Sequence, residues 1–390
     1  MHPPDVAIIG VGQTPYRRRH DAATPDLVGA AVQEALADAG AAMSDVDIVI
    51  AGFAPDGLAG ENCPDKRFLP AAGAVGKWSM RVNTGGTTGI AAAYTAMDLL
   101  EAGYGDIAIA IGVERMAQAL DVPAVFNTIF DPIYEKDFVL TTITMAALRA
   151  TMLMNRDGFT AEHWAGIASR NFTNATRNPL VIGAKARTVD DVLQSPVLAW
   201  PIHLYEACPV SEGACAVIVA RADAVGSRSP AWIHGTGAFS DTYAMGDRMR
   251  RAEGSLIEMV PLRRAAEAAY KQAGITDPRG QVDVVELQAP FAIIEAMAYP
   301  ALGLCTIDEN RGFVERAIAG EVDVAINPSG GAQAANPVSA TALVRIAEAA
   351  LQVRQRAGER QIDGATVALA TGQGGATQFS TVCLLGSEAP

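Results

Sequence analysis

Four loop segments of this chain carry the residues best suited to chemistry. They combine small residues, above all glycine, with Asn, Gln and Thr, and none contains His or Cys. Glycine lets a ligand approach the main chain closely, and successive amide groups in such loops bind anions. The segments therefore predict a pocket that holds negative charge with main-chain N–H groups. They span residues 83–89, 286–291, 327–332 with 336–337, and 371–375.

These segments resemble the active-site loops of the thiolase superfamily, most closely its sterol-carrier or lipid-transfer branch, and the resemblance extends from Val6 to Leu385. In that family the first loop holds a nucleophilic Cys, the second reads His-Asp-Cys-Phe and the third reads Gly-His-Pro. Gly86, Gln288 and Asn336 stand at the corresponding positions here. Glycine forms no acyl-enzyme and asparagine does not titrate. The resemblance thus implies a thiolase-like protein without the catalytic Cys and His.

The main-chain donors of such a pocket remain even when its reactive side chains are replaced. The family places the first loop at the start of a buried helix, where free N–H groups and the helix dipole favour negative charge. A thioester enolate or a carboxylate is the ligand that such donors hold. The expected oxyanion and substrate-binding residues are Asn83, Gly86, Thr87, Gln288, Asn327, Gly331, Asn336, Gly374 and Gly375.

Few titratable residues offer themselves as catalytic groups beside these loops. His203, Tyr205 and Tyr243 are the weak candidates, and each also has a structural interpretation in a turn or at the surface. Glu286 ends an apolar strand directly before the second loop. Its carboxylate is expected to hold that loop through a backbone hydrogen bond, with a role as a base as the alternative.

Composition excludes several classes of function. The net charge of -13 argues against a nucleic-acid partner, because phosphate binding needs clustered Lys and Arg. One basic cluster, residues 17–20, is expected to be a solvated loop, with a contact to CoA phosphates as the alternative. The five cysteines have no metal-ligand spacing, so we expect reduced thiols and no metal site. No secretory leader and no bilayer-crossing segment are expected, which favours a cytoplasmic location.

An internal repeat indicates two similar halves. Residues 10–12 match 235–237, residues 31–40 match 265–274, and residues 47–49 match 283–285. Apolar strands alternate with helices in each half, and the helix expected over 26–39 has Asp26 as its N-cap. Strands covered by helices on both sides predict a layered α/β fold.

The resemblance implies a five-layered α-β-α-β-α sandwich with an added loop domain. We expect an N-terminal thiolase half at 1–225, which includes the loop domain at about 114–207, and a C-terminal half at 226–390. The loop domain would lie over the acyl and pantetheine channel. Its methionine-bearing segment, residues 140–154, is expected to pack as a helix, with a pliable ligand wall as the alternative.

Two functions from different classes fit these features. The first is a Cys-independent carbon-carbon bond enzyme of the aldolase type, which cleaves a bulky β-hydroxyacyl-CoA, such as that of a steroid. It works with a zinc-ribbon and OB-fold partner subunit, as some lipid-transfer thiolase relatives do. The second is a non-catalytic subunit that binds acyl-CoA or scaffolds an active partner. Both imply a CoA thioester as substrate or ligand, no bound cofactor, and a homodimer formed near residues 79–90. A nicotinamide oxidoreductase based on Gly10 and Gly12 lacks the third glycine of that fingerprint.

Overall fold

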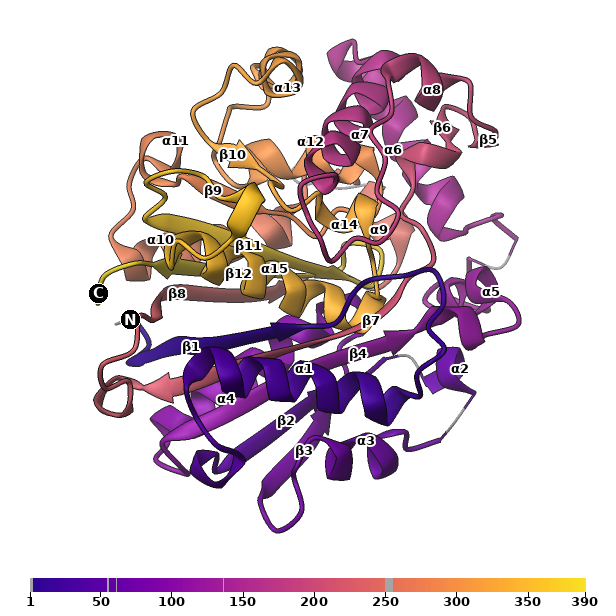
Figure 1. Cartoon of the computed structure of the whole chain (residues 1–390). Helices are drawn as coiled ribbons and strands as arrows, with labels where there is room; N and C mark the ends of the chain where they lie inside the picture. Colours follow the sequence, from indigo (N-terminus) through magenta and orange to yellow (C-terminus); the bar gives the residue numbers. More distant parts are fainter. Residues whose placement is uncertain (1–2, 55, 61, 136, 250–254) are drawn as a thin grey trace.

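A computed structural model describes residues 3–54, 56–60, 62–135, 137–249 and 255–390 of the chain (Figure 1). The first half contains β1 (Val6–Gln13), α1 (Thr24–Ala39), β2 (Ile48–Gly52), α2 (Asp56–Ala59), α3 (Asp65–Ala71), β3 (Trp78–Val82), α4 (Thr88–Glu101), β4 (Ile107–Arg115) and β7 (Glu212–Arg221). Between β4 and β7 lie α5 (Val122–Asn127), α6 (Thr142–Asp157), α7 (Ala161–Ala175), α8 (Val189–Leu193), β5 (Val197–Ala199) and β6 (Ile202–His203).

The second half begins at β8 (Ala231–Ser240) and ends at β12 (Phe379–Gly386). The elements between them are α9 (Met245–Met249), α10 (Val260–Ala273), α11 (Pro278–Gln281), β9 (Val284–Glu286), α12 (Ala292–Ala301), α13 (Asn310–Ala319), β10 (Ala325–Ile326), α14 (Gly331–Ala334), α15 (Val338–Val353) and β11 (Val367–Gly374).

The strand order shows the internal repeat directly. Ten strands form one sheet in the order β10-β9-β11-β12-β8-β1-β7-β4-β2-β3. Its centre is the pair β8 and β1, and four further strands follow on each side: β12, β11, β9 and β10 beyond β8, and β7, β4, β2 and β3 beyond β1. The repeated residues 10–12 and 235–237 lie in the central strands β1 and β8, and residues 47–49 and 283–285 lie at β2 and β9. The repeat in the sequence is therefore a repeat of the fold.

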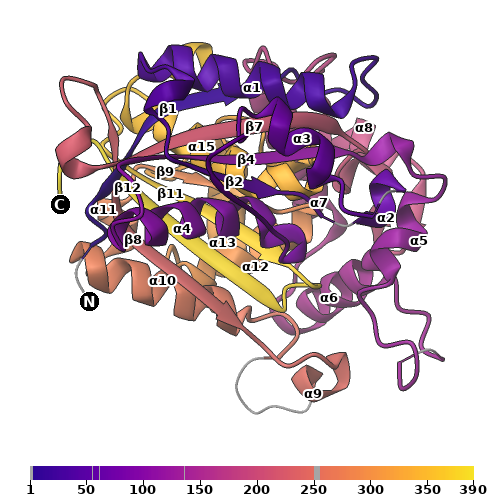
Figure 2. The ribbon, with the colours of Figure 1, turned by 90° about the horizontal axis from the view of Figure 1, so that it is seen from below.

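The layers follow the predicted sandwich (Figure 2). Helices α4 and α15 pack against each other and against the inner faces of both half-sheets, where they form one apolar cluster. Helix α1 covers the outer face of the first half-sheet, and α10 covers that of the second. The two β layers are joined at one edge, because β1 pairs with β8 through Ala7–Trp232 and Ile8–Ala231.

The glycines of β1 serve helix packing. A Cβ on Gly12 would overlap the carbonyl oxygen of Ala31 in α1, and a Cβ on Gly237 would overlap that of Ala265 in α10. The same close approach thus recurs in both halves. This role accounts for the Gly10-Val11-Gly12 pattern without a dinucleotide.

Helix ends differ from the sequence prediction by one or two residues. Helix α1 begins at Thr24 with Ala23 as its N-cap, so the assignment of Asp26 as N-cap is wrong. Asp26 lies in the first turn, where its carboxylate accepts a hydrogen bond from the backbone nitrogen of Ala23 at 3.1 Å. Gly40 ends the helix in the left-handed conformation, as predicted. In the described residues, no helix is long and apolar enough to cross a membrane.

Candidate functional site

The first, second and fourth predicted loops meet at one cavity of about 230 Å³, and Asn336 joins them from the end of the third loop. The loops supply one wall, and helices α5 and α6 supply the facing wall. Most of the lining is apolar. It comprises Gly85, Gly86, Val125, Phe126, Thr128, Ile129, Thr142, Met145, Ala146, Arg149, Cys208, Gln288, Pro290, Phe291, Ile294, Asn336, Val338, Gln373, Gly374, Gly375, Ala376 and Thr377.

Main chain closes the cavity at Gly86. A Cβ on Gly86 would overlap the carbonyl oxygen of Gln373 and would lie 3.2 Å from the Cα of Gly374. A Cβ on Gly374 would in turn lie 2.9 Å from the Gly86 nitrogen and 3.2 Å from the Thr87 nitrogen. Glycine is therefore required on both sides of this contact, and no side chain can project from position 86 without moving β11.

Gln288 ties the first loop to the fourth. Its Nε2 donates to the carbonyl oxygen of Gly86 at 2.9 Å, and its Oε1 accepts from the nitrogen of Gln373 at 3.0 Å. Its own backbone nitrogen donates to Thr371 Oγ1 at 3.0 Å. The amide group thus has a donor and an acceptor role already in use, and its position is fixed from both sides.

Asn336 is fixed in the same way. Its Oδ1 accepts from Thr341 Oγ1 at 2.7 Å, and its backbone nitrogen donates to Ser211 Oγ at 3.1 Å. Its Nδ2 donates to Cys208 Sγ at 3.1 Å. Burial raises the pKa of the Cys208 thiol to about 11, although the Asn336 hydrogen bond acts in the opposite direction. The thiol is therefore protonated at neutral pH.

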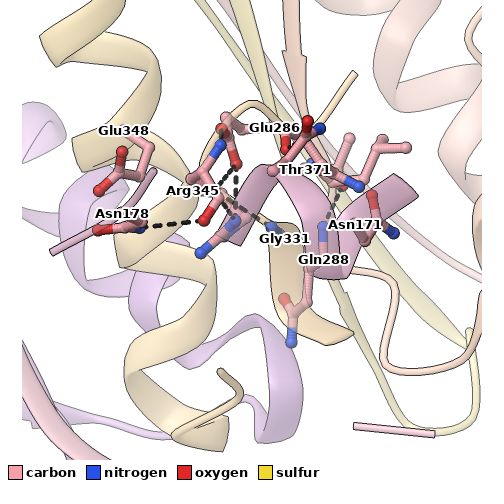
Figure 3. Close-up of polar contacts among 12 residues, drawn as sticks. Asn171, Asn178, Glu286, Gln288, Gly331, Arg345, Glu348 and Thr371 are labelled. Carbon is pink, nitrogen blue, oxygen red and sulfur yellow. Dashed lines mark hydrogen bonds and ion pairs between the residues drawn. The ribbon is translucent and has the colours of Figure 1, made fainter. Parts of the chain in front are cut away.

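The buried ion pair between Glu286 and Arg345 holds the third loop in place (Figure 3). Glu286 accepts from the nitrogen of Ser329 at 3.0 Å and from its Oγ at 2.7 Å, and Arg345 donates to the same carboxylate at 2.6 Å. Burial raises the pKa of Glu286, opposed by the charge of Arg345. This geometry agrees with the loop-holding role expected for Glu286.

Two predicted ligand-binding residues of the third loop face its interior instead of the cavity. Asn327 is buried and accepts from the nitrogen of Leu287 at 2.7 Å, while its Nδ2 donates to Glu295 at 2.8 Å. The nitrogen of Gly331 donates to Ser329 Oγ at 3.2 Å. Their groups are used to shape the loop, and neither residue lines the cavity.

The first loop contributes fewer residues to the cavity lining than its sequence predicts. Asn83 is exposed, and its Oδ1 accepts from the nitrogen of Gly85 at 3.1 Å. Thr87 is buried and donates its hydroxyl to the carbonyl oxygen of Thr84 at 2.9 Å. Neither lines the cavity, so Gly86 alone represents the first loop among the expected binding residues.

The weak catalytic candidates lie elsewhere. His203 lies 3.5 Å from the buried carboxylate of Glu206, and Tyr205 stacks on the guanidinium of Arg187 with 3.7 Å from that group to the ring centroid. Tyr243 is about half exposed. None of these three lines the cavity.

Sequence reasoning missed the contributions of α5 and of Arg149 to the cavity wall, and gave a methionine-bearing ligand wall at residues 140–154 only as its alternative. Thr141 caps α6 by accepting from the nitrogen of Thr144 at 3.0 Å, and Gly158 ends the helix in the left-handed conformation. This placement brings Met145 and Arg149 to the cavity. Met145 thus lines the cavity, which agrees with the alternative interpretation of residues 140–154 and differs from the preferred one, helix packing. For Arg149, the only signal in the sequence was its i, i+4 spacing from Met145.

The lining sets limits on the chemistry. Among the described residues, Arg149 and Cys208 are the titratable side chains that line the cavity, and no carboxylate or imidazole joins them. The described residues also contain no cluster of His, Cys, Asp and Glu that could hold a metal ion. The cavity can enclose an apolar group next to fixed amides and main-chain dipoles.

Comparison with known proteins agrees with this architecture. Residues 6–180 match the thiolase N-terminal domain, and residues 244–387 match the thiolase C-terminal domain-like family. An acetyl-CoA acetyltransferase of Methanothermobacter thermautotrophicus is 31% identical over 378 residues, which cover 95% of this chain and 96% of that protein. Sterol carrier protein 2 of Gallus gallus is 31% identical over 383 residues, which cover 93% of this chain and 68% of that protein.

A solved structure shares the fold along its whole length. The Ltp2-ChsH2(DUF35) aldolase superimposes with a TM-score of 0.83 at 21% identity, and the match covers 99% of this chain and 98% of that one. The sequence matches and this fold together identify the chain as a member of the thiolase family, with sterol carrier protein 2 among its relatives.

Proposed function

We propose that this chain binds an acyl-CoA in the cavity and cleaves a carbon-carbon bond of a β-hydroxyacyl-CoA without a covalent intermediate. The contact between Gly86 and Gln373 carries the proposal. The carbonyl oxygen of Gln373 occupies the space that a side chain at position 86, where the family places its nucleophilic Cys, would need. A cavity lined mainly by apolar groups nevertheless lies beside that point.

Retro-aldol cleavage needs no nucleophile. A base takes the proton of the β-hydroxyl group, the bond between Cα and Cβ breaks, and a ketone or aldehyde leaves. The electron pair remains on the thioester as an enolate, which regains a proton at Cα. The N–H of Gln288 Nε2 that is not donated to Gly86 would stabilise that enolate.

The proton acceptor in this proposal comes from a partner subunit. The thiol of Cys208 cannot accept this proton at neutral pH, because its pKa of about 11 keeps it protonated, and Arg149 is a cation. The aldolase of the same fold supports a two-protein arrangement, since its name pairs Ltp2 with ChsH2(DUF35). A zinc-ribbon and OB-fold subunit is the partner that we propose.

The size of the cavity limits the acyl groups that can bind. Its volume of about 230 Å³ is smaller than the roughly 300–1,000 Å³ of sites for drug-sized ligands. It accommodates the thioester and a short acyl part. A steroid ring system would require α5 and α6 to move apart.

We place the active protein in the cytoplasm as a homodimer. All five cysteines are free thiols, which suits a reducing compartment. Strand β3 is the last strand at its edge of the sheet, and Trp78 and Met80 are exposed on it. An exposed apolar edge strand is a ready site for pairing with a second copy.

A non-catalytic acyl-CoA-binding subunit is the second candidate. The lack of a carboxylate or imidazole among the described lining residues favours it. In that case the cavity would hold a thioester for chemistry on the partner, or only stabilise the complex.

One experiment separates these functions. The purified protein is mixed with short β-hydroxyacyl-CoA substrates, with and without the zinc-ribbon protein, and the released carbonyl compound is trapped as a hydrazone and measured by mass spectrometry. Thr142→Trp fills the cavity from α6, and Thr151→Trp on the same helix lies outside the lining as a control.

Turnover that requires the partner, survives Thr151→Trp and is lost in Thr142→Trp supports the enzyme. Binding by calorimetry without turnover in the presence of the partner supports the non-catalytic subunit. Absence of binding for every CoA ester contradicts the enzyme and the acyl-CoA-binding subunit, and supports a subunit that only stabilises the complex.

A further inference from the structure

Arg149 is a buried cation in the wall of the cavity. It projects from α6, is 1% exposed and lines the cavity together with Met145 and Ala146. Its Nη2 donates to the carbonyl oxygen of Ala376 at 2.9 Å and to Thr377 Oγ1 at 2.6 Å. Both acceptors are neutral, so neither balances its charge.

The rest of the guanidinium has no hydrogen-bond partner. Within the described residues, Nε and Nη1 of Arg149 are buried and have no acceptor, and Arg149 forms no ion pair with a carboxylate. Buried arginines are ordinarily paired, because an uncompensated charge in a protein interior is costly. Two N–H donor groups of this guanidinium, Nε and Nη1, are therefore left without an acceptor.

A second guanidinium group lies next to that of Arg149. Arg248 in α9 donates its Nη1 to the same carbonyl oxygen of Ala376 at 3.0 Å. Burial, and then the charge of Arg248, lower the pKa of Arg149 to about 9. Two guanidinium groups thus meet at one carbonyl group beside the cavity.

We propose that Arg149 binds a carboxylate at the far end of the acyl group, so that the substrate class is a short ω-carboxyacyl-CoA. This inference rests on the proposed acyl-CoA cavity and adds a specificity determinant to it. A carboxylate oxygen that accepts from the unpartnered Nη1 group would form a charge-assisted hydrogen bond and balance the buried charge. The cavity volume of about 230 Å³ suits an acyl chain of a few carbons between the thioester and that carboxylate.

The phosphates of CoA are the other source of negative charge, and the surroundings of Arg149 disfavour them. The lining around it consists mainly of apolar side chains, among them Phe126, Met145 and Ile294. A diphosphate carries several charges, and Arg149 is the one cation among the described lining residues. A single carboxylate matches this charge.

Arg149 also has a structural role that a test must separate from binding. Gly375, Ala376 and Thr377 adopt left-handed conformations with φ of 55°, 57° and 66°. Such a turn is strained at Ala376 and Thr377, and the arginine hydrogen bonds hold it in place. A purely structural arginine would stabilise this turn but would not distinguish one acyl group from another.

The test compares glutaryl-CoA with pentanoyl-CoA, which have the same chain length and differ in the terminal carboxylate. Their dissociation constants are measured by calorimetry on the full chain, with CoA alone as a third ligand. For the wild type we expect glutaryl-CoA to bind about 10- to 100-fold more tightly than pentanoyl-CoA. Arg149→Met should remove this preference, and Arg149→Lys should retain part of it.

Arg156→Met is the matched control. Arg156 lies on the same helix, is partly exposed and pairs with Asp157 and Glu258 outside the cavity. This variant should keep the wild-type preference. If Arg149→Met does not fold, the affinity ratios of glutaryl-CoA to pentanoyl-CoA for the wild type and for Arg149→Lys still show whether Arg149 binds the carboxylate.

The outcomes separate the two proposals. Equal affinity of the wild type for both thioesters leaves the acyl-CoA cavity standing and overturns the carboxylate site. Weakening of CoA alone by Arg149→Met, by the same factor as for glutaryl-CoA, assigns Arg149 to the phosphates and also overturns it. No binding of any thioester overturns both proposals.

Discussion

The carbonyl oxygen of Gln373 occupies the position that the first side-chain atom of residue 86 would take. Gly86 and Gln373 come from opposite halves of the chain, and the side chain of Gln288 bridges their main chains. The surroundings of position 86 are thus built around a glycine. A nucleophile at this position is incompatible with the conformation of β11.

Gly86→Cys should therefore not restore a thiolase. The new Cβ has to displace main-chain atoms, and overpacking of this kind costs about 1–3 kcal/mol of unfolding free energy or more. Urea denaturation measures the loss, and mass spectrometry after incubation with acetyl-CoA should show no acylated protein. Gly246→Ala is the control, because a Cβ there meets no atom within 4 Å. A stable, acylated Gly86→Cys protein would contradict the closed geometry.

Gln288→Leu should destabilise the protein. Leucine has a similar size but leaves the carbonyl oxygen of Gly86 and the nitrogen of Gln373 without their partner. Each buried group left unsatisfied costs about 1–3 kcal/mol, so we expect a loss of at least about 2 kcal/mol in chemical denaturation. Gln194→Leu, at an exposed position, should change stability little. A loss below about 0.5 kcal/mol for Gln288→Leu would show that the bridge is dispensable.

Glu206 should make stability depend on pH. Burial raises the pKa of its carboxyl group to about 8, above the value near 4.5 that the unfolded chain has. Between these two values the folded state keeps a proton that the unfolded state has lost. The stabilisation by this group is thus complete below pH 4.5 and falls by about 1.4 kcal/mol per pH unit up to pH 8.

Glu206→Gln should flatten that dependence. The neutral amide keeps the size of the side chain and does not ionise, so the unfolding free energy of the variant should fall less between pH 5 and pH 8 than that of the wild type. Denaturation at several pH values measures both slopes. The exposed Glu267→Gln variant should retain the wild-type slope, and equal slopes for all three proteins would rule out a raised pKa at Glu206.

The proposed homodimer predicts a mass in solution of twice 40.6 kDa. Light scattering at micromolar concentration should show it, and Trp78→Lys with Met80→Lys should give monomers, because lysine on an edge strand opposes pairing. Leu120→Lys, at an exposed site away from β3, should remain dimeric. A monomeric wild type would end the dimer proposal.

The sequence predicts the architecture well because the repeat and the apolar strands are local patterns. Residues 10–12 and 235–237 reveal equivalent strands, and their glycines show where helices pack. The loops around Gly86, Gln288 and Gly374 also come together as predicted. These features depend on spacing along the chain, which a sequence displays.

The details of the cavity depend on contacts between distant segments and could not be predicted. Asn327 and Gly331 belong to a binding-type motif, yet their polar groups satisfy their own loop. Arg149 looks like an ordinary helix residue until the turn at Ala376 is placed beside it. Whether a polar group is already paired is decided by tertiary structure.

The bridge between Gly86, Gln288 and Gln373 has a consequence for synthesis. Strand β11 leaves the ribosome after the whole first half, so a nascent chain with a finished first half still lacks one side of its cavity. The acyl-CoA that we propose as ligand can bind only after β11 has been made. Ligand binding would thus report that translation has passed β11.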